Sequence, residues 1–243
     1  MVVKILVLFL SAFLAGMLAL FMPQWKEKNF KMILIFAGSY LFSITVLHIL
    51  PELFANRDSA YYMGLYVLIG FLLQQVLEFL SSGIEHGHIH HHGGGRNTVW
   101  MVMIGLSLHA FLEGTLLSQQ PSLTGHHHGS ETLMFGIIMH KAPAAFALVA
   151  VLLSSLKKNL VIVLLLVFAL ASPLGMISSA LLQEQSILTT EAMDVLFGLV
   201  AGGFLHISTT IFFESSPHHK FHFKRLLISL LAALVAIASE YLL

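Results

Sequence analysis

Eight apolar segments of about twenty residues each follow one another along the chain, with short polar stretches between them. A helix of that length crosses the ~30 Å hydrocarbon core of a lipid bilayer. The segments lie at about 3–22, 30–50, 61–82, 97–118, 132–154, 159–181, 189–211 and 222–242. This pattern predicts an all-α membrane protein with eight transmembrane helices.

The composition agrees with this prediction. Of the 243 residues, 57% are hydrophobic and only 10% are charged, whereas soluble domains have about 25% charged residues. The eight segments and their short loops leave no room for a separate soluble domain. We therefore expect a single transmembrane domain over residues 1–243, surrounded by lipid and without a nucleic-acid partner.

Lysine and arginine gather in alternate loops, and this orients the predicted helices. One side holds nine of the twelve cations, namely Lys26, Lys28, Lys31, Arg96, Lys157, Lys158, Lys220, Lys224 and Arg225. The opposite side holds only Lys4 and Arg57, and Lys141 lies within a segment. The positive-inside rule then places the nine-cation side in the cytoplasm and both termini outside. Lysines directly after the first segment also favour a retained span over a cleaved signal peptide.

Two short stretches in the second and seventh segments are alike. Residues 37–41 read Ala-Gly-Ser-Tyr-Leu and residues 201–205 read Ala-Gly-Gly-Phe-Leu. The two predicted helices cross the membrane in opposite directions, which is the pattern of an inverted repeat as found in many transporters. A chance likeness of five residues is the alternative.

The fourth segment carries an imidazole and a carboxylate on one helix face. His109 and Glu113 are four residues apart, the spacing that puts two side chains next to each other on a helix. Each ionisable group inside a membrane costs roughly 2.5 kcal/mol or more unless it is paired or hydrated. A buried histidine bonded to a backbone carbonyl is the simpler alternative for His109 alone.

His140 in the fifth segment lies at a similar depth, counted in residues from the outer end of each predicted helix. Two imidazoles and one carboxylate are a suitable ligand set for zinc or a similar divalent ion. The chain has no cysteine, so thiolate ligands and disulfides are excluded. We therefore predict a metal site formed by His109, Glu113 and His140 near the middle of the membrane.

Two prolines and a lysine lie close to this predicted site in the sequence. Pro143 follows His140 by three residues, and Ser172-Pro173 lies at similar depth in the sixth segment. A proline inside a helix frees the carbonyl four residues earlier, so we expect kinks at both positions. Lys141 is a cation beside a cation site, and it either pairs with Glu113 or fills the place of a second ion.

Further histidines outline a route across the membrane. His48 and Glu52 flank Pro51 at the outer end of the second segment and are candidates for an entrance site, with a solvated helix end as the alternative. His206 and Glu214 in the seventh segment are candidates for an exit site.

A histidine-rich loop at about 83–96 follows the third segment, on the predicted cytoplasmic side. Histidine tracts flanked by glycines bind divalent metals, and a tag-like tract is the alternative. The metal-binding candidates in this loop are His86, His88, His90, His91 and His92. A second tract, at residues 126–128, lies on the predicted outer side.

The chain resembles the ZIP (Zrt-/Irt-like) family of divalent metal transporters over most of its length. The motifs that carry this resemblance are His109-Ala-Phe-Leu-Glu113-Gly114, His140-Lys141-Ala-Pro143-Ala, His48-Ile-Leu-Pro51-Glu52, Ser172-Pro173-Leu-Gly175 and the histidine-rich loop. The His-Lys pair in the fifth segment is similar to one branch of the family. The family's eight helices with both termini outside match the topology predicted from charge.

The resemblance implies uptake of zinc or another divalent metal into the cytoplasm, often by a homodimer. It also implies that His109, Glu113 and His140 hold the transported ion. Some members bind a second metal, through an asparagine at the position of Ala110, an acid at Lys141 and glutamates at Ala144 and Ser172. All four are absent here, so the resemblance implies one metal, with the Lys141 ammonium replacing the other.

We expect a transporter that opens alternately to each side of the membrane, and not an enzyme. Zinc is the expected substrate, with Fe²⁺, Mn²⁺ and Cd²⁺ as alternatives, and no organic cofactor is expected. The expected location is the cell membrane, or an organelle membrane in a eukaryote. Two other hypotheses are a membrane hydrolase in which zinc activates water and a metal-sensing membrane protein.

Overall fold

The computed structural model describes residues 1–21, 27–55, 60–81, 96–118, 129–214 and 222–242. Over these residues the fold is entirely helical, as predicted from the sequence. The elements are α1 (Val2–Phe21), α2 (Glu27–Ile44), η1 (Thr45–Ile49), α3 (Leu50–Ala55), α4 (Ala60–Ser81), α5 (Arg96–Leu116), α6 (Gly129–Leu153), α7 (Lys158–Glu184), α8 (Thr190–Glu214) and α9 (Phe223–Leu242). Since α2, η1 and α3 follow one another without a break, the eight predicted helices are confirmed.

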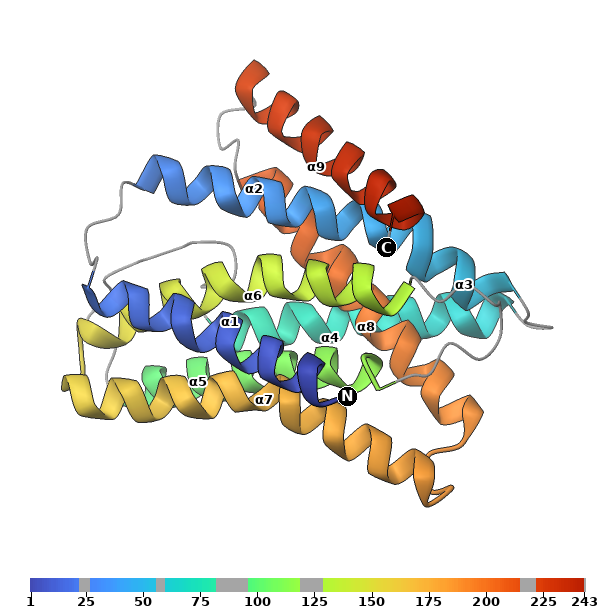
Figure 1. Cartoon of the computed structure of the whole chain (residues 1–243), viewed down its shortest axis with the longest axis horizontal. Coiled ribbons are helices and arrows are strands. Elements are labelled where there is room, and N and C mark those ends of the chain that lie inside the picture. Colours follow the sequence, from blue (N-terminus) through green and yellow to red (C-terminus); the bar gives the residue numbers. More distant parts are fainter. Residues whose placement is uncertain (22–26, 56–59, 82–95, 119–128, 215–221, 243) are drawn as a thin grey trace.

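Successive helices run in opposite directions along the long axis of the bundle (Figure 1). Seven helices in the described part of the chain are long and apolar enough to cross a membrane, and α9 supplies the eighth predicted segment. Both chain termini lie toward the same end of the bundle in Figure 1. The protein is therefore a multi-pass membrane protein, and the side of the membrane on which the termini lie stays a prediction from charge.

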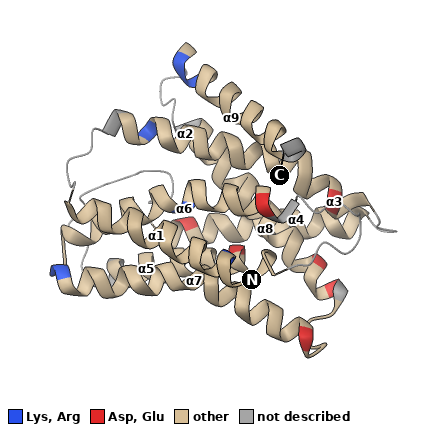
Figure 2. Cartoon of the chain, in the orientation of Figure 1, with Lys and Arg blue, Asp and Glu red and all other residues tan. Residues whose placement is uncertain are grey.

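Figure 2 shows basic residues mainly at one end of the bundle and acidic residues mainly at the opposite end and within the bundle. Lys31, Lys158 and Lys224 lie near the starts of α2, α7 and α9, whereas Lys4 lies at the start of α1. Acidic residues such as Glu184 and Glu191 lie at the opposite end, where α7 ends and α8 begins. Lys31, Lys158 and Lys224 are three of the nine basic residues on which the predicted orientation depends.

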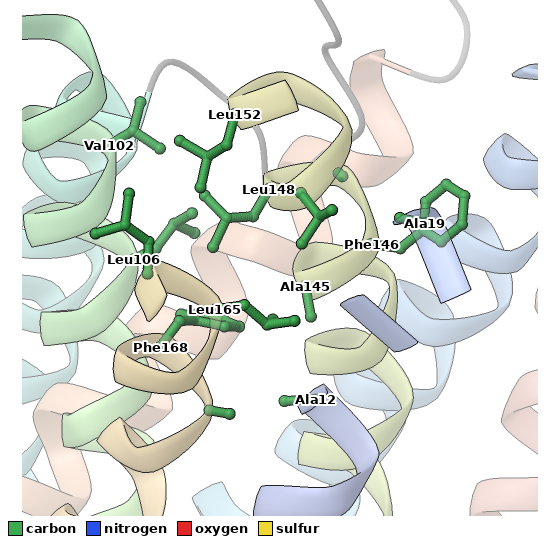
Figure 3. Packing of buried hydrophobic residues seen from close by; sticks show 14 of the residues in the cluster. Ala12, Ala19, Val102, Leu106, Ala145, Phe146, Leu148, Leu152, Leu165 and Phe168 are labelled. Carbon is green, nitrogen blue, oxygen red and sulfur yellow. The ribbon is translucent and has the colours of Figure 1, made fainter. Parts of the chain in front are cut away.

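Two clusters of buried apolar residues hold the helices together. The first joins α1, α5, α6 and α7 with Phe30 and Leu34 of α2, and Figure 3 shows Leu148 and Leu152 of α6 pointing toward Leu106 of α5. The second joins α2, α8 and α9 with residues of α5, α6 and α7. Lipid tails are as apolar as leucine, so close packing and interhelical hydrogen bonds, rather than release of water, stabilise such helix pairs.

Glycines bring two helix pairs into backbone contact. A Cβ atom on Gly114 of α5 would collide with the carbonyl oxygen of Ser172 on α7, and Gly175 on α7 meets the backbone of α5 in the same way. Gly70 of α4 and Gly202 of α8 each lie against the backbone of the facing helix in the same way. Small residues at such positions allow close approach of membrane helices, so α5–α7 and α4–α8 are the tightly joined pairs around the site.

The second transmembrane helix contains one π-helical turn, η1. The backbone N–H of Leu50 donates to the carbonyl of Thr45, five residues earlier instead of four. Pro51 follows directly and has no N–H to donate. The helix continues to Ala55, so this span extends five residues beyond the predicted end at residue 50.

Candidate metal site

Three ionisable side chains meet between α5 and α6. Glu113 Oε1 lies 2.7 Å from His109 Nε2 and 2.5 Å from His140 Nε2. All three residues are buried, and their ligand atoms lie within 4.8 Å of one another. The two residues predicted from helical spacing and the third predicted from depth thus converge on one point.

The other ring nitrogen of each histidine is held by a hydrogen-bond acceptor. His140 Nδ1 donates to the carbonyl of Gly136, 2.8 Å away and one turn earlier on α6. His109 Nδ1 donates to Gln74 Oε1 on α4 over 2.9 Å. Metal-ligating histidines commonly donate their second N–H in this way, which fixes the ring and its tautomer. Both Nε2 atoms are therefore presented as ligands toward Glu113.

This geometry requires a cation at the centre of the group. Since each Nδ1 carries a hydrogen, a neutral imidazole has only a lone pair at Nε2. A lone pair 2.5–2.7 Å from a carboxylate oxygen is repelled by it unless a positive charge lies between them. A proton or a metal ion can fill that role, and two nitrogens with one oxygen suit a zinc ion.

Two small cavities adjoin the group and share His109 and Glu113 in their walls. One cavity extends between α5, α6 and α7 and is also lined by His140, Lys141 and Ala144. The other extends between α4 and α8, where Gln74, Leu77 and Gly203 line it. The candidate ligands His109 and Glu113 therefore border both cavities.

Lys141 lies in the first cavity beside the ligand group and is almost fully buried. Its ammonium donates to Ser172 Oγ over 2.5 Å, and Ser172 Oγ donates to the carbonyl of Ala110 over 2.6 Å. The ammonium also lies 5.2 Å from the ring centre of Phe168. The sequence comparison with two-metal members singled out Ala110, Lys141, Ala144 and Ser172. Hydrogen bonds link three of them, Lys141, Ser172 and Ala110. The fourth, Ala144, lines the same cavity.

The two prolines lie within unbroken helices. α6 continues through Pro143 and α7 continues through Pro173. Both are buried beside the site, and the carbonyl of Ser172 faces Gly114 of α5. The predicted kinks stay predictions.

The candidate entrance pair lies at the end of the helix formed by α2, η1 and α3. His48 Nε2 is 3.6 Å from Glu52 Oε2, and the two side chains are 18% and 40% exposed. His48 belongs to the π-helical turn, and Glu52 to α3. The structure thus brings together the two residues that the spacing predicted to be neighbours.

His206 has a different partner from the predicted one. Its Nε2 contacts Glu78 Oε2 on α4, whereas Glu214 is eight residues further along α8, roughly 12 Å away along the helix axis. The side chain of Glu214 lies outside the described residues, as do His86, His88, His90, His91 and His92. The structure therefore supports a contact for His206 but not a pair formed with Glu214.

Sequence reasoning missed two polar residues on α4. Gln74 is 3% exposed and accepts a hydrogen bond from His109. Glu78 lies one turn later, and its carboxylate contacts His206. The signal was their spacing, since an amide and a carboxylate four residues apart inside an apolar segment share one helix face. Which helix that face meets depends on packing between distant segments.

Comparison with known proteins identifies the family. The model of the family described as "ZIP Zinc transporter" matches residues 85–239. "Zinc transporter ZIP9" of Xenopus tropicalis is 30% identical over 157 residues, which cover 61% of this chain and 50% of that protein. "Zinc transporter ZIP1" of Danio rerio is 30% identical over 141 residues, covering 57% and 44%. This chain thus spans about half the length of the curated relatives it matches, and since the family model covers well over half of its residues, it belongs to the ZIP zinc transporter family.

Proposed function

We propose that the protein carries zinc into the cytoplasm through a site formed by His109, Glu113 and His140, opening alternately to each side of the membrane. The observation that carries this proposal is the convergence of two oriented imidazoles on one buried carboxylate. Nitrogen and oxygen ligands suit zinc, and Fe²⁺, Mn²⁺ and Cd²⁺ are alternative substrates of the same site. The relatives named zinc transporters support the same substrate.

The proposed route begins at His48 and Glu52 and ends in the cytoplasm. The partly exposed entrance pair attracts the cation, and the buried site between the two cavities then takes it up. His206 and Glu214 on α8 follow on the inner side, and the histidine-rich loop receives the ion. The direction rests on the predicted orientation of the bundle.

We propose that the core site holds one ion, because a buried ammonium stands where a second would bind. Lys141 Nζ is held by Ser172 in the cavity that adjoins His140 and Glu113. A cation fixed there repels a second divalent ion at short range. A water molecule or another side chain completes the ligand shell of the bound zinc.

The proposed setting is the cell membrane, or an organelle membrane in a eukaryote. The family resemblance supports a homodimer. The candidate metal site is formed by residues of a single chain.

Zinc uptake into liposomes tests the proposal. The purified chain is reconstituted in vesicles that contain a zinc-sensitive dye, and the wild type is compared with His109→Ala, Glu113→Gln and His140→Ala. We expect each substitution to lower uptake more than about 100-fold, since even partners of metal ligands contribute about 10–100-fold. Glu191→Gln, an exposed carboxylate at the end of the bundle, is the matched control and should transport normally. Equal uptake in all variants would contradict the proposal.

The hydrolase hypothesis is not favoured. The relatives are named as zinc transporters, and Glu113 contacts both imidazoles, which favours a role as a metal ligand over one as a general base. The sensor hypothesis has no observation in its favour among the described residues. Uptake that depends on the three ligands separates transport from both.

A further inference from the structure

Another histidine–carboxylate contact lies near the core site, and it joins His206 to a carboxylate that the proposed route does not include. His206 on α8 is 6% exposed, and its Nε2 contacts Glu78 Oε2 on α4. The ring of Phe71 packs edge-to-face against the imidazole of His206, with 4.8 Å between the ring centres. A buried imidazole facing a carboxylate oxygen presents the same donor atoms as the core group.

The orientation of His206 is less strongly fixed than that of the core histidines. Its Nδ1 is buried and has no hydrogen-bond partner among the described residues, whereas Nδ1 of His109 and of His140 each donates to an acceptor. Loss of such a partner typically weakens metal binding by about 10–100-fold. With two protein ligands and an unsupported ring, this pair would hold a metal more weakly than the core site.

The pair lies one helical turn beyond the residue that supports His109. Glu78 follows Gln74 by four residues on α4, a rise of roughly 6 Å. Gly203, one turn before His206 on α8, faces the side chain of Gln74, and both line the cavity that reaches His109 and Glu113. The charge pattern predicts that α4 and α8 both run toward the cytoplasm, so Glu78 and His206 lie on the cytoplasmic side of the core.

We propose that His206 and Glu78 form a second, weaker site for a divalent cation, which receives the ion from the core site and releases it toward the cytoplasm. The relay role rests on the proposed transport function, but binding of the metal does not. A relay site must bind well enough to accept the ion and weakly enough to release it, and a two-ligand site with water completing the shell meets this need. Glu78 takes the place next to His206 that the spacing on α8 had suggested for Glu214.

Because the chain has no cysteine, a single thiolate introduced at position 206 reports on the site directly. The experiment uses the full-length protein in detergent with the His206→Cys substitution and Cd²⁺ as the probe, and it follows the ultraviolet cadmium–thiolate absorption. We expect a saturable signal that weakens at least tenfold in affinity when Glu78→Gln is added. Ser208→Cys, buried on the same helix and bonded to the backbone, is the control and should give no saturable signal at those concentrations.

Uptake into liposomes supplies the second measurement and does not need the cysteine. We expect Glu78→Gln and His206→Gln to slow zinc release into the vesicle at least tenfold while zinc affinity at the core site stays within about twofold. Normal uptake in both variants would overturn the relay role, and absence of the Glu78-dependent cadmium signal would overturn the site. If the wild type itself carries no zinc, the proposed transport function fails while the cadmium experiment still decides the site.

Discussion

Gln74 on α4 accepts a hydrogen bond from His109 Nδ1 on α5, with 2.9 Å between the two atoms. The bond crosses from the α4–α8 pair to the α5–α7 pair, so it links one of the candidate metal ligands to the other helix pair. It also fixes the tautomer in which His109 Nε2 faces Glu113. A residue that touches no metal therefore orients one of the ligands.

Replacing Gln74 by leucine should weaken zinc binding without unfolding the protein. Without its acceptor the His109 ring loses its fixed tautomer, and the expected loss of affinity is about 10–100-fold. Competition with a chromophoric chelator measures this affinity on the purified chain. Gln75→Leu, on the exposed side of α4, is the control, and equal affinities in the two variants would contradict the role given to Gln74.

Gly114→Ala should separate α5 from α7. The new methyl group would overlap the carbonyl of Ser172, and overpacking of this kind costs about 1–3 kcal/mol. We expect a lower unfolding temperature in detergent together with reduced zinc affinity, because Glu113 is the adjacent residue. Gly64→Ala meets nothing within 4 Å and should leave both quantities unchanged or slightly raise stability, so similar destabilisation by both alanines would refute the close contact.

The wild-type core should bind one zinc ion, and removal of the Lys141 ammonium should allow a second. Metal analysis is best done after the histidines of both loop tracts have been replaced by serine. In that background we expect one ion per chain, and a second, weaker ion in Lys141→Asp, where a carboxylate replaces the cation beside Glu113. Two tightly held ions with Lys141 intact would show that the ammonium does not take the place of a metal.

Loss of the entrance pair should affect uptake at low zinc concentrations more than at saturation. His48→Ala or Glu52→Gln removes one half of the partly exposed contact, and we expect about a tenfold fall in kcat/KM, in the lower range of electrostatic steering. The maximal rate should stay near that of the wild type, because the core ligands are intact. Glu131→Gln, an exposed carboxylate in the first turn of α6, controls for general loss of negative charge. A fall in the maximal rate alone would argue against an entrance role.

The convergence of His109, Glu113 and His140 was predictable because local spacing and depth carry the information. His109 and Glu113 share a helix face by period alone, and counting residues into neighbouring segments brought His140 to the same layer. Gln74 and Glu78 were not predictable in the same way. Their partners depend on which helices pack together, and residues such as Gly70 and Gly202 settle this through contacts between distant parts of the chain.

Most helix boundaries were also predictable from local sequence, and one was not. Hydropathy predicted the eight helices to within a few residues at most ends, since an apolar run of fixed length specifies a span. The second span was predicted too short because Pro51 and Glu52 resemble a helix end. The π-helical turn lets the backbone pass Pro51 and remain helical to Ala55.

That turn also decides which side chains leave the core. Before the π-helical turn, Leu41 and Thr45 are buried on one face of the helix. In a regular α-helix the next residues on that buried face would be 48 and 52. The extra residue in the turn shifts burial to Ile49 and Leu53 instead. An α-helix advances by 100° per residue, so the same sequence in a regular α-helix, without the π-helical turn, would rotate the histidine and the carboxylate inward. The outward position of the candidate entrance pair thus depends on the π-helical turn.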